Sequence, residues 1–140
     1  MSIQIFNGNL GVNFAPTRAF LLASEKITVD FLVTVTVGPA VIEWYLEYGS
    51  MNPNDPAAEW LREVAEEDVG NGVVYMPKVV RRLTDNDNAL HQLAQGTHYL
   101  SAQMMRAHQL CRLQVRMAAA PVATAAMRVT IPIGYAANGT

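Results

Sequence analysis

The chain has 140 residues, of which 51% are hydrophobic and 16% charged, and its formal net charge is −2. This composition excludes a disordered or fibrous protein and fits one domain with its own core. The negative charge argues against general affinity for nucleic acid, and no apolar stretch is long enough to predict a membrane span. Because average soluble domains have roughly 25% charged residues, we expect a partner to cover part of the surface.

The single cysteine and the first residues exclude further classes of protein. Cys111 has no second cysteine, which excludes an internal disulfide and a zinc ribbon, and its strand-like surroundings predict a buried thiol. The opening MSIQIFNGN lacks the basic and apolar regions of a signal peptide. We therefore expect a protein made in the cytoplasm, with no membrane partner.

Residues 1–20 are apolar but interrupted by Asn and Gly at short intervals. Ile3, Ile5 and Phe6 supply apolar anchors, whereas the glycines that follow make the segment flexible on its own. Two interpretations stay open: an arm that adds to the sheet of a second chain, or an edge strand of its own sheet. We favour the arm, and we assign Ile3, Ile5 and Phe6 to an assembly interface.

Residues 27–37 alternate apolar and polar side chains, as a strand with one buried face does. A Gly-Pro pair interrupts the alternation, and residues 42–48 resume it, which predicts an antiparallel hairpin. Glu43, Tyr45 and Glu47 would then lie on the outer face, with the two carboxylates solvated. The core residues expected from this hairpin are Phe31, Val33, Val35, Trp44 and Leu46.

The segment of residues 52–72 is ambiguous. Asp55 and Pro56 fit the N-cap and first position of a short helix over residues 57–67, but Trp60, Arg62 and Val64 could equally alternate in a strand. We favour the helix and leave the strand open. Further along, the sequence predicts a turn at 71–72, a short apolar run at 73–76, a loop at 85–88 and a strand at 98–105.

The C-terminal part repeats the strand pattern. Residues 111–117 and 127–133 alternate and are joined by an alanine-rich connection, which predicts a second hairpin. Pro132, inside the last run, indicates an edge strand or a bulge. The core residues expected here are Leu113, Val115, Val129 and Ile131.

Two hairpins separated by a long excursion predict a mainly β protein. We expect an antiparallel two-sheet β-sandwich of jelly-roll or immunoglobulin-like type, with a short helix in the excursion. Residues 1–20 would be the arm or edge strand, 21–135 the sandwich domain and 136–140 a flexible tail.

Motifs for catalysis and cofactor binding are missing from the sequence. It contains no nucleotide-binding glycine loop, no HExxH and no GxSxG. His91, His98 and His108 are seven and ten residues apart, which fits no local metal site. We therefore predict no catalytic residue, no metal and no cofactor, and we expect the surfaces to carry the function.

Charge is distributed unevenly along the chain. Acidic residues concentrate between positions 55 and 68, whereas no acidic residue follows Asp87 and the late strands carry Arg112, Arg116 and Arg128. Such regions can pair between copies in an array or within the domain, and the sequence leaves both open. We add the three arginines to the expected assembly interface.

Aromatic side chains raise an alternative, because rings on the outer face of a sandwich can stack on sugars. Trp44 alternates with core positions, which favours packing, and Tyr45 is the ring that this register places outside. A carbohydrate-binding or adhesion module therefore stays the second hypothesis, with Tyr45 and Trp60 as the residues to test.

The order of these features carries a resemblance. A strand ending in EWYLEYGSMNPND leads through AAEWLREV to HQLCRLQVRMAAAPVATAAMRVTIPI. This order resembles the small β-sandwich structural proteins of tailed-phage virions, including head decoration and cement proteins. The resemblance implies a non-enzymatic bacteriophage protein, made in the host cytoplasm and located in the virion, whose copies bind the capsid or another virion protein and each other. The matching residues are Trp60, Arg112, Leu113, Val115, Val129, Ile131 and Ile133.

Overall fold

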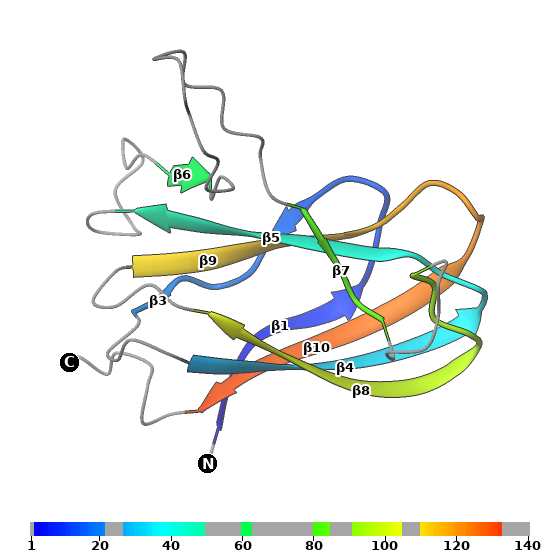
Figure 1. The fold of residues 1–140 in the computed structure, drawn as a ribbon, viewed down its shortest axis with the longest axis horizontal. Coiled ribbons are helices and arrows are strands. Elements are labelled where there is room, and N and C mark those ends of the chain that lie inside the picture. The colour runs from blue at the N-terminus through cyan, green and yellow to red at the C-terminus, as the bar shows by residue number, and fades with distance from the viewer. Residues whose placement is uncertain are drawn as a thin grey trace, which may run out of the picture.

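A computed structural model describes residues 2–21, 27–49, 60–62, 80–84, 91–104 and 110–132. Among these residues the secondary structure is entirely strand, so the described chain has no helix that could cross a lipid bilayer. The strands are β1 (Ser2–Asn9), β2 (Ala15–Pro16), β3 (Phe20–Leu21), β4 (Ile27–Val37), β5 (Ile42–Gly49), β6 (Trp60–Arg62), β7 (Arg81–Arg82), β8 (Gly96–Met104), β9 (Leu110–Met117) and β10 (Thr124–Pro132) (Figure 1).

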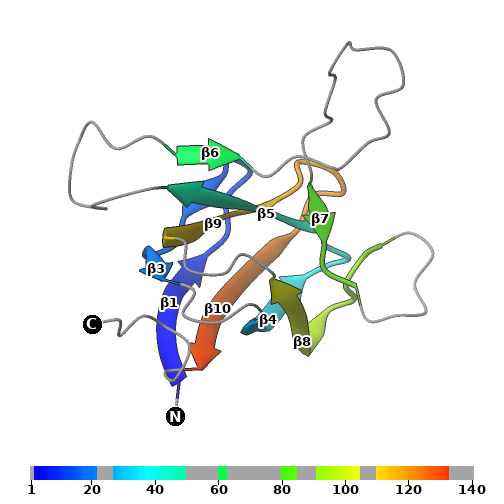
Figure 2. The same cartoon turned by 60° about the vertical axis from the view of Figure 1, so that its left-hand side comes forward.

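The strands form two antiparallel sheets that face each other, as Figures 1 and 2 show from two directions. The first sheet has the order β1-β10-β4-β8. The second has the order β2-β9-β5-β6, with β3 also on β9 and β7 also on β5. The expected mainly β, antiparallel sandwich is therefore confirmed.

The strand order is that of a jelly roll. β2 and β3 lie along β9 as one interrupted strand, and β6 and β7 lie along β5 in the same way. If β2 and β3 are counted as one strand, and β6 and β7 as another, the described residues form eight strands that pair from the outside inwards. β1 pairs with β10, β2 and β3 with β9, β4 with β8, and β5 with β6 and β7. These pairs alternate between the two sheets, as in the double-sheet jelly roll, so of the two expected sandwich types the structure has the jelly roll.

The two expected hairpins are wrong, because each joins strands that lie in different sheets. β4 pairs β10 and β8, whereas β5 pairs β9, β6 and β7. At Gly38 an added Cβ would lie 2.9 Å from Cγ1 of Val35 and 3.0 Å from the backbone N of Gln95. The chain bends tightly there and crosses to β5 of the opposite sheet, and between the two strands Ala40 forms an isolated antiparallel bridge with Leu93.

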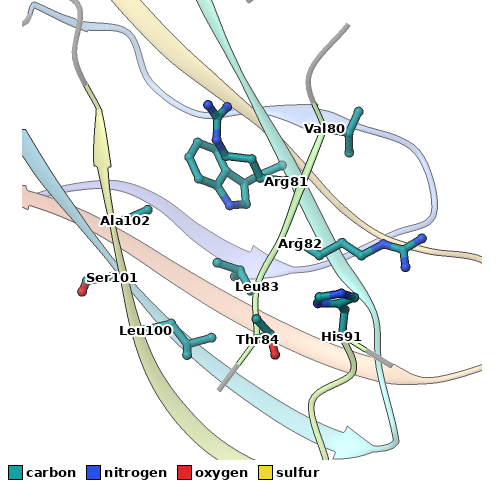
Figure 3. Close-up of a pocket in the computed structure, with 10 residues that line it drawn as sticks. Val80, Arg81, Arg82, Leu83, Thr84, His91, Leu100, Ser101 and Ala102 are labelled. Atoms are coloured by element: carbon teal, nitrogen blue, oxygen red, sulfur yellow. The ribbon is translucent and has the colours of Figure 1, made fainter. Parts of the chain in front are cut away.

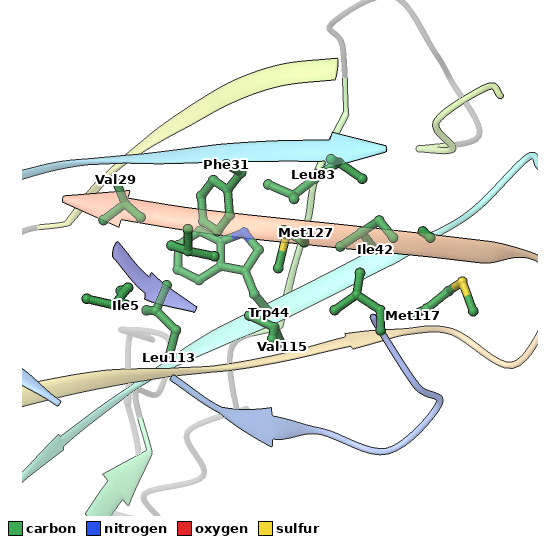
Figure 4. Packing of buried hydrophobic residues seen from close by; sticks show 14 of the residues in the cluster. Ile5, Val29, Phe31, Ile42, Trp44, Leu83, Leu113, Val115, Met117 and Met127 are labelled. Carbon is green, nitrogen blue, oxygen red and sulfur yellow. The ribbon is translucent and has the colours of Figure 1, made fainter. Parts of the chain in front are cut away.

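The core lies between the sheets and is built from the inward residues of β4, β5, β9 and β10 (Figure 4). Phe31 of the first sheet packs against Trp44 of the second, with ring centroids 5.4 Å apart. Cys111 is fully buried, as expected. All nine residues predicted for the core are buried: Phe31, Val33, Val35, Trp44, Leu46, Leu113, Val115, Val129 and Ile131.

The N-terminal segment is an edge strand of its own sheet, which was the alternative to an arm. β1 pairs β10 antiparallel from Ser2 to Asn9, with a register shift between Gln4 and Phe6. The shift adds one residue to β1, so that Ile3, Ile5 and Phe6 all reach the core. Ile5 is only 3% exposed, so its side chain is unavailable to a second chain and its assignment to an interface is wrong.

Two further expectations need correction. β10 is an interior strand, flanked by β1 and β4, and Pro132 lies at its end, beyond its last pair with β4. There the missing N–H of proline breaks no bond between β10 and β4. The expected helix over 57–67 is wrong at β6, whose residues pair with β5 from Glu47 to Gly49. The other residues of that range lie outside the described ones.

The remaining expectations fall partly on described residues. The strand predicted at 98–105 is confirmed by β8. The turn at 71–72, the apolar run at 73–76, the loop at 85–88 and the tail at 136–140 lie outside the described residues.

Candidate functional site

The outer face of the second sheet carries a connected set of arginines, carboxylates and aromatic rings, which we call the arginine–carboxylate face. Its residues come from four neighbouring strands and from the segment that precedes β2, so the jelly roll itself assembles the set. They are Phe14, Glu43, Tyr45, Glu47, Trp60, Arg62, Arg82, Arg112, Gln114 and Arg116.

Glu47 is the centre of one row of this face. It lies opposite Arg62 on one side and opposite Arg112 on the other. Nε of Arg112 donates to Oε1 of Glu47 at 2.8 Å, and Nε2 of Gln114 donates to the same oxygen at 2.7 Å. A buried carboxylate is stable here because charged and polar donors replace its lost water.

Glu43 is the centre of the second row. It lies opposite Arg82 on β7 and Arg116 on β9. Nη2 of Arg116 lies 2.8 Å from Oε1 of Glu43, and Nε of Arg82 lies 3.4 Å from Oε2. Glu43 and Glu47 are 7% and 9% exposed. The expectation that both carboxylates are solvated is therefore wrong, because long side chains of the neighbouring strands cover them.

Three arginines of this face also stack on aromatic rings. Cζ of Arg62 lies 3.8 Å from the ring centroid of Tyr45, and Cζ of Arg112 lies 4.3 Å from that of Trp60. Arg116 stacks in the same way on Phe14, at 4.3 Å. For Arg112 and Arg116 these cation–π contacts, added to the ion pairs, fix the guanidinium in one orientation. Arg62 is held by the ring of Tyr45, and its Nε is buried without a hydrogen-bond partner among the described residues.

The pKa of Tyr45 depends on its burial and on the charges of this face. Burial raises the pKa of Tyr45 above its usual value of 10.0, and the negative charge of Glu47 raises it further, while Arg62, Arg112 and Arg116 oppose the shift. The ring of Phe14 meets that of Tyr45 edge on, with centroids 4.7 Å apart. Tyr45 is therefore a neutral, packed ring at physiological pH.

The chemistry of the face suits binding. Both carboxylates accept from arginines, which holds each of them in place. Among the described residues of the face four arginines outnumber two glutamates, so this set carries a net positive charge. Arg82 is the most open of the paired arginines, with 47% of its side chain exposed, against 35% for Arg116 and 25% for Arg112.

The structure does not bring the six residues of the expected assembly interface together. Ile3, Ile5 and Phe6 pack on the core from β1, whereas Arg112 and Arg116 lie on the arginine–carboxylate face. Arg128 is exposed on the outer face of the first sheet. Of the two alternatives for the late arginines, pairing within the domain holds for Arg112 and Arg116.

Sequence reasoning missed the partners of these arginines. Glu43 and Glu47 lie on β5, and arginines from later strands lie opposite them because β6, β7 and β9 all pair with β5. The available signal was the alternation Glu-Tyr-Glu on one run and Arg-Gln-Arg on another, since opposite charges on facing positions stabilise a strand pair.

A cavity of about 520 Å³ opens between β7 and β8 (Figure 3). Arg81, Arg82 and His91 give it a basic lining, and Cζ of Arg81 lies 5.4 Å from the ring centroid of Trp44. In the described part of the chain no hydrogen bond links His91 to a hydroxyl of Ser101 or Thr84. These lining residues therefore form no assembled pair of nucleophile and base.

The two described histidines do not form a metal site. Nε2 of His98 lies 2.7 Å from the carbonyl oxygen of Ala94, and within the described ranges no three His, Cys, Asp or Glu side chains cluster closely enough to hold a metal ion. His108 lies outside those ranges.

Comparisons with known proteins add no relative: no family model, no curated protein and no solved structure matches the chain.

Proposed function

We propose that the chain is a non-enzymatic structural protein of a tailed-phage virion, most specifically a decoration or cement protein that binds the capsid and neighbouring copies. The observation that carries this proposal is the arginine–carboxylate face. The jelly-roll order supports it as an analogy of fold, because jelly rolls recur in viral capsid proteins.

The composition of the face suits a protein–protein interface. Arg, Trp and Tyr are the residue types that most often dominate binding energy at such interfaces. Here the guanidinium groups of Arg112 and Arg116 are already held between a carboxylate and a ring. A partner therefore immobilises few side chains on binding, which lowers the entropic cost of association.

Charge selects the partner. A face with two more arginines than carboxylates attracts an acidic surface. The same sequence carries six acidic residues between positions 55 and 68, so a neighbouring copy supplies suitable charge, as does an acidic patch on a capsid. This leads to the proposed role between copies and between copy and capsid.

The gene context and co-sedimentation test the proposal together. We expect a major capsid, portal or tail gene beside the coding sequence, and we expect the purified protein to sediment with particles assembled from that capsid protein. Arg82→Glu, on the arginine–carboxylate face, should abolish co-sedimentation, whereas Arg128→Glu, on the opposite sheet, should preserve it. Arg82→Gln and an unfolding curve of each variant separate lost charge from lost folding.

Absence of the wild-type protein from the particle fraction would overturn the proposal. Equal losses of co-sedimentation in Arg82→Glu and Arg128→Glu would show that the arginine–carboxylate face is not the capsid-binding surface.

A further inference from the structure

The outer face of the first sheet carries a second candidate surface. It holds a shallow hollow of about 620 Å³, lined among others by Gln4, Asp30, Leu32, Tyr99, Arg128 and Thr130. These residues lie on all four strands of the sheet. We call this the tyrosine face.

The register arranges the tyrosine face in two rows. In one row Gln4, Thr130 and Asp30 lie side by side on β1, β10 and β4. In the next row Arg128, Leu32 and Tyr99 lie side by side on β10, β4 and β8. Arg128 and Tyr99 are two strand spacings apart, about 10 Å. The hollow is therefore longer than one sugar ring and has an aromatic end and a charged end.

Tyr99 is the unusual element of this surface. Its side chain belongs to a residue that is 76% exposed, and its outward neighbours on β8, Thr97 and Ser101, are small, polar and also exposed. An aromatic ring so open on a polar sheet face is the informative exception among surface residues. By contrast, the rings of Tyr45 and Trp60 are already covered by the guanidinium groups of Arg62 and Arg112. The ring that is open to a ligand is therefore that of Tyr99.

The polar groups around Tyr99 identify the class of ligand. Arg128 donates hydrogen bonds, Asp30 accepts them, and Gln4 and Thr130 can do both. Within the described part of the chain neither Asp30 nor Arg128 enters an ion pair. Arg128 and Asp30 lie on adjacent strands in adjacent rows, and one cation near one anion gives no net attraction for a phosphate or sulfate. A single leucine offers little to an apolar ligand. Adjacent sugar hydroxyls, which both donate and accept, match this set.

We propose that the tyrosine face binds a neutral oligosaccharide, with one sugar ring stacked on Tyr99 and the hydroxyls of the next held by Asp30 and Arg128. The proposal is independent of the virion role, since it uses the opposite sheet. If both hold, the protein attaches to a particle through one sheet and presents a saccharide-binding surface on the other.

A microarray of neutral and sialylated oligosaccharides, probed with the purified full chain, supplies the ligand for the test. We expect binding to neutral glycans. For the best of them, titration calorimetry should show affinity reduced about tenfold or more in Tyr99→Ala, retained in Tyr99→Phe, and reduced in Asp30→Asn. Arg82→Gln, on the opposite sheet, should bind as the wild type does, and unfolding curves should show that all four variants fold.

Three results would overturn the inference: no neutral glycan bound, preference for sialylated glycans, or unchanged affinity in Tyr99→Ala. None of them bears on co-sedimentation with capsids, so failure here and failure of the virion role are told apart.

Discussion

Arg112 and Glu47 lie directly opposite each other on β9 and β5, and Nε of Arg112 donates to Oε1 of Glu47 at 2.8 Å. The pair lies on the outer face of a sandwich, yet Glu47 is only 9% exposed. A carboxylate in such a place is stable only while Arg112 and Gln114 donate to it, and these donors in turn need the carboxylate as their acceptor. The pair therefore stabilises the second sheet and is also part of the proposed interface.

Replacing Glu47 by Ala should lower the free energy of unfolding by about 1–3 kcal/mol, because Arg112 and Gln114 lose a shared acceptor in a partly buried place. Urea unfolding at neutral pH measures the change. Asp30→Ala is the matched control, since Asp30 is an exposed carboxylate on the first sheet and surface changes of this kind stay within about 0.5 kcal/mol. Equal effects of the two substitutions would show that the Glu47 cluster adds no stability.

Tyr45 gives the second sheet a predicted sensitivity to alkali. Its pKa is raised in the folded protein by burial and by Glu47, so the folded state holds the phenolic proton more tightly than the unfolded state does. The resulting contribution to stability is complete below the unfolded pKa of about 10. It is lost as the pH rises through the folded value.

The measurement compares thermal unfolding midpoints of wild type and Tyr45→Phe from about pH 8 to about pH 11, a range that spans the unfolded pKa. The midpoint of the wild type should fall more steeply above about pH 10 than that of the variant, which has no proton to lose. Parallel pH profiles would show that Tyr45 ionises alike in both states.

The sequence predicts which residues face the core but not which strands pair. Alternation of apolar and polar side chains has the same period whether the next strand lies beside the first or across from it. The nine core residues from Phe31 to Ile131 were therefore found, while both hairpins were wrong. The crossover after β4 passes Gly38, where an added Cβ would meet the backbone of Gln95, a distant part of the chain that only the fold brings there.

The buried carboxylates were missed for the same reason. A glutamate on the outer face of a strand reads as solvated unless its cross-strand neighbours are known. The neighbours of Glu43 and Glu47 are Arg82, Arg62, Arg112 and Arg116, on three strands spread over more than fifty residues. Long-range pairing of this kind leaves little trace in a local pattern.

Gly38→Ala should destabilise the protein by about 1–3 kcal/mol, because a Cβ there meets Val35 and the backbone of Gln95 and the crossover must shift. Gly8→Ala is the matched control: nothing lies within 4 Å of a Cβ at Gly8 in β1. That change should be neutral or slightly stabilising, because alanine loses less backbone entropy on folding. Urea unfolding of the two variants tests the crossover, and similar midpoints for both would refute its tight packing.

The last prediction concerns β1, where the structure selects between an arm and an edge strand. Ile5 is 3% exposed in the core between the sheets, and β1 covers the side of β10 that would otherwise be open. Ile5→Ala should therefore cost about 2–5 kcal/mol. Gln4→Ala, one residue earlier and exposed, should change stability by no more than about 0.5 kcal/mol.

Deletion of residues 1–13 extends the same test, because it removes all of β1 together with Ile5 and leaves the edge of β10 exposed. We expect an unfolded or aggregating chain, observed as lost cooperativity in thermal unfolding and as large species in sedimentation. A deletion variant that melts cooperatively near the wild-type temperature but no longer self-associates would restore the arm. In that case the pairing of β1 with β10 would have to be available between chains as well as within one.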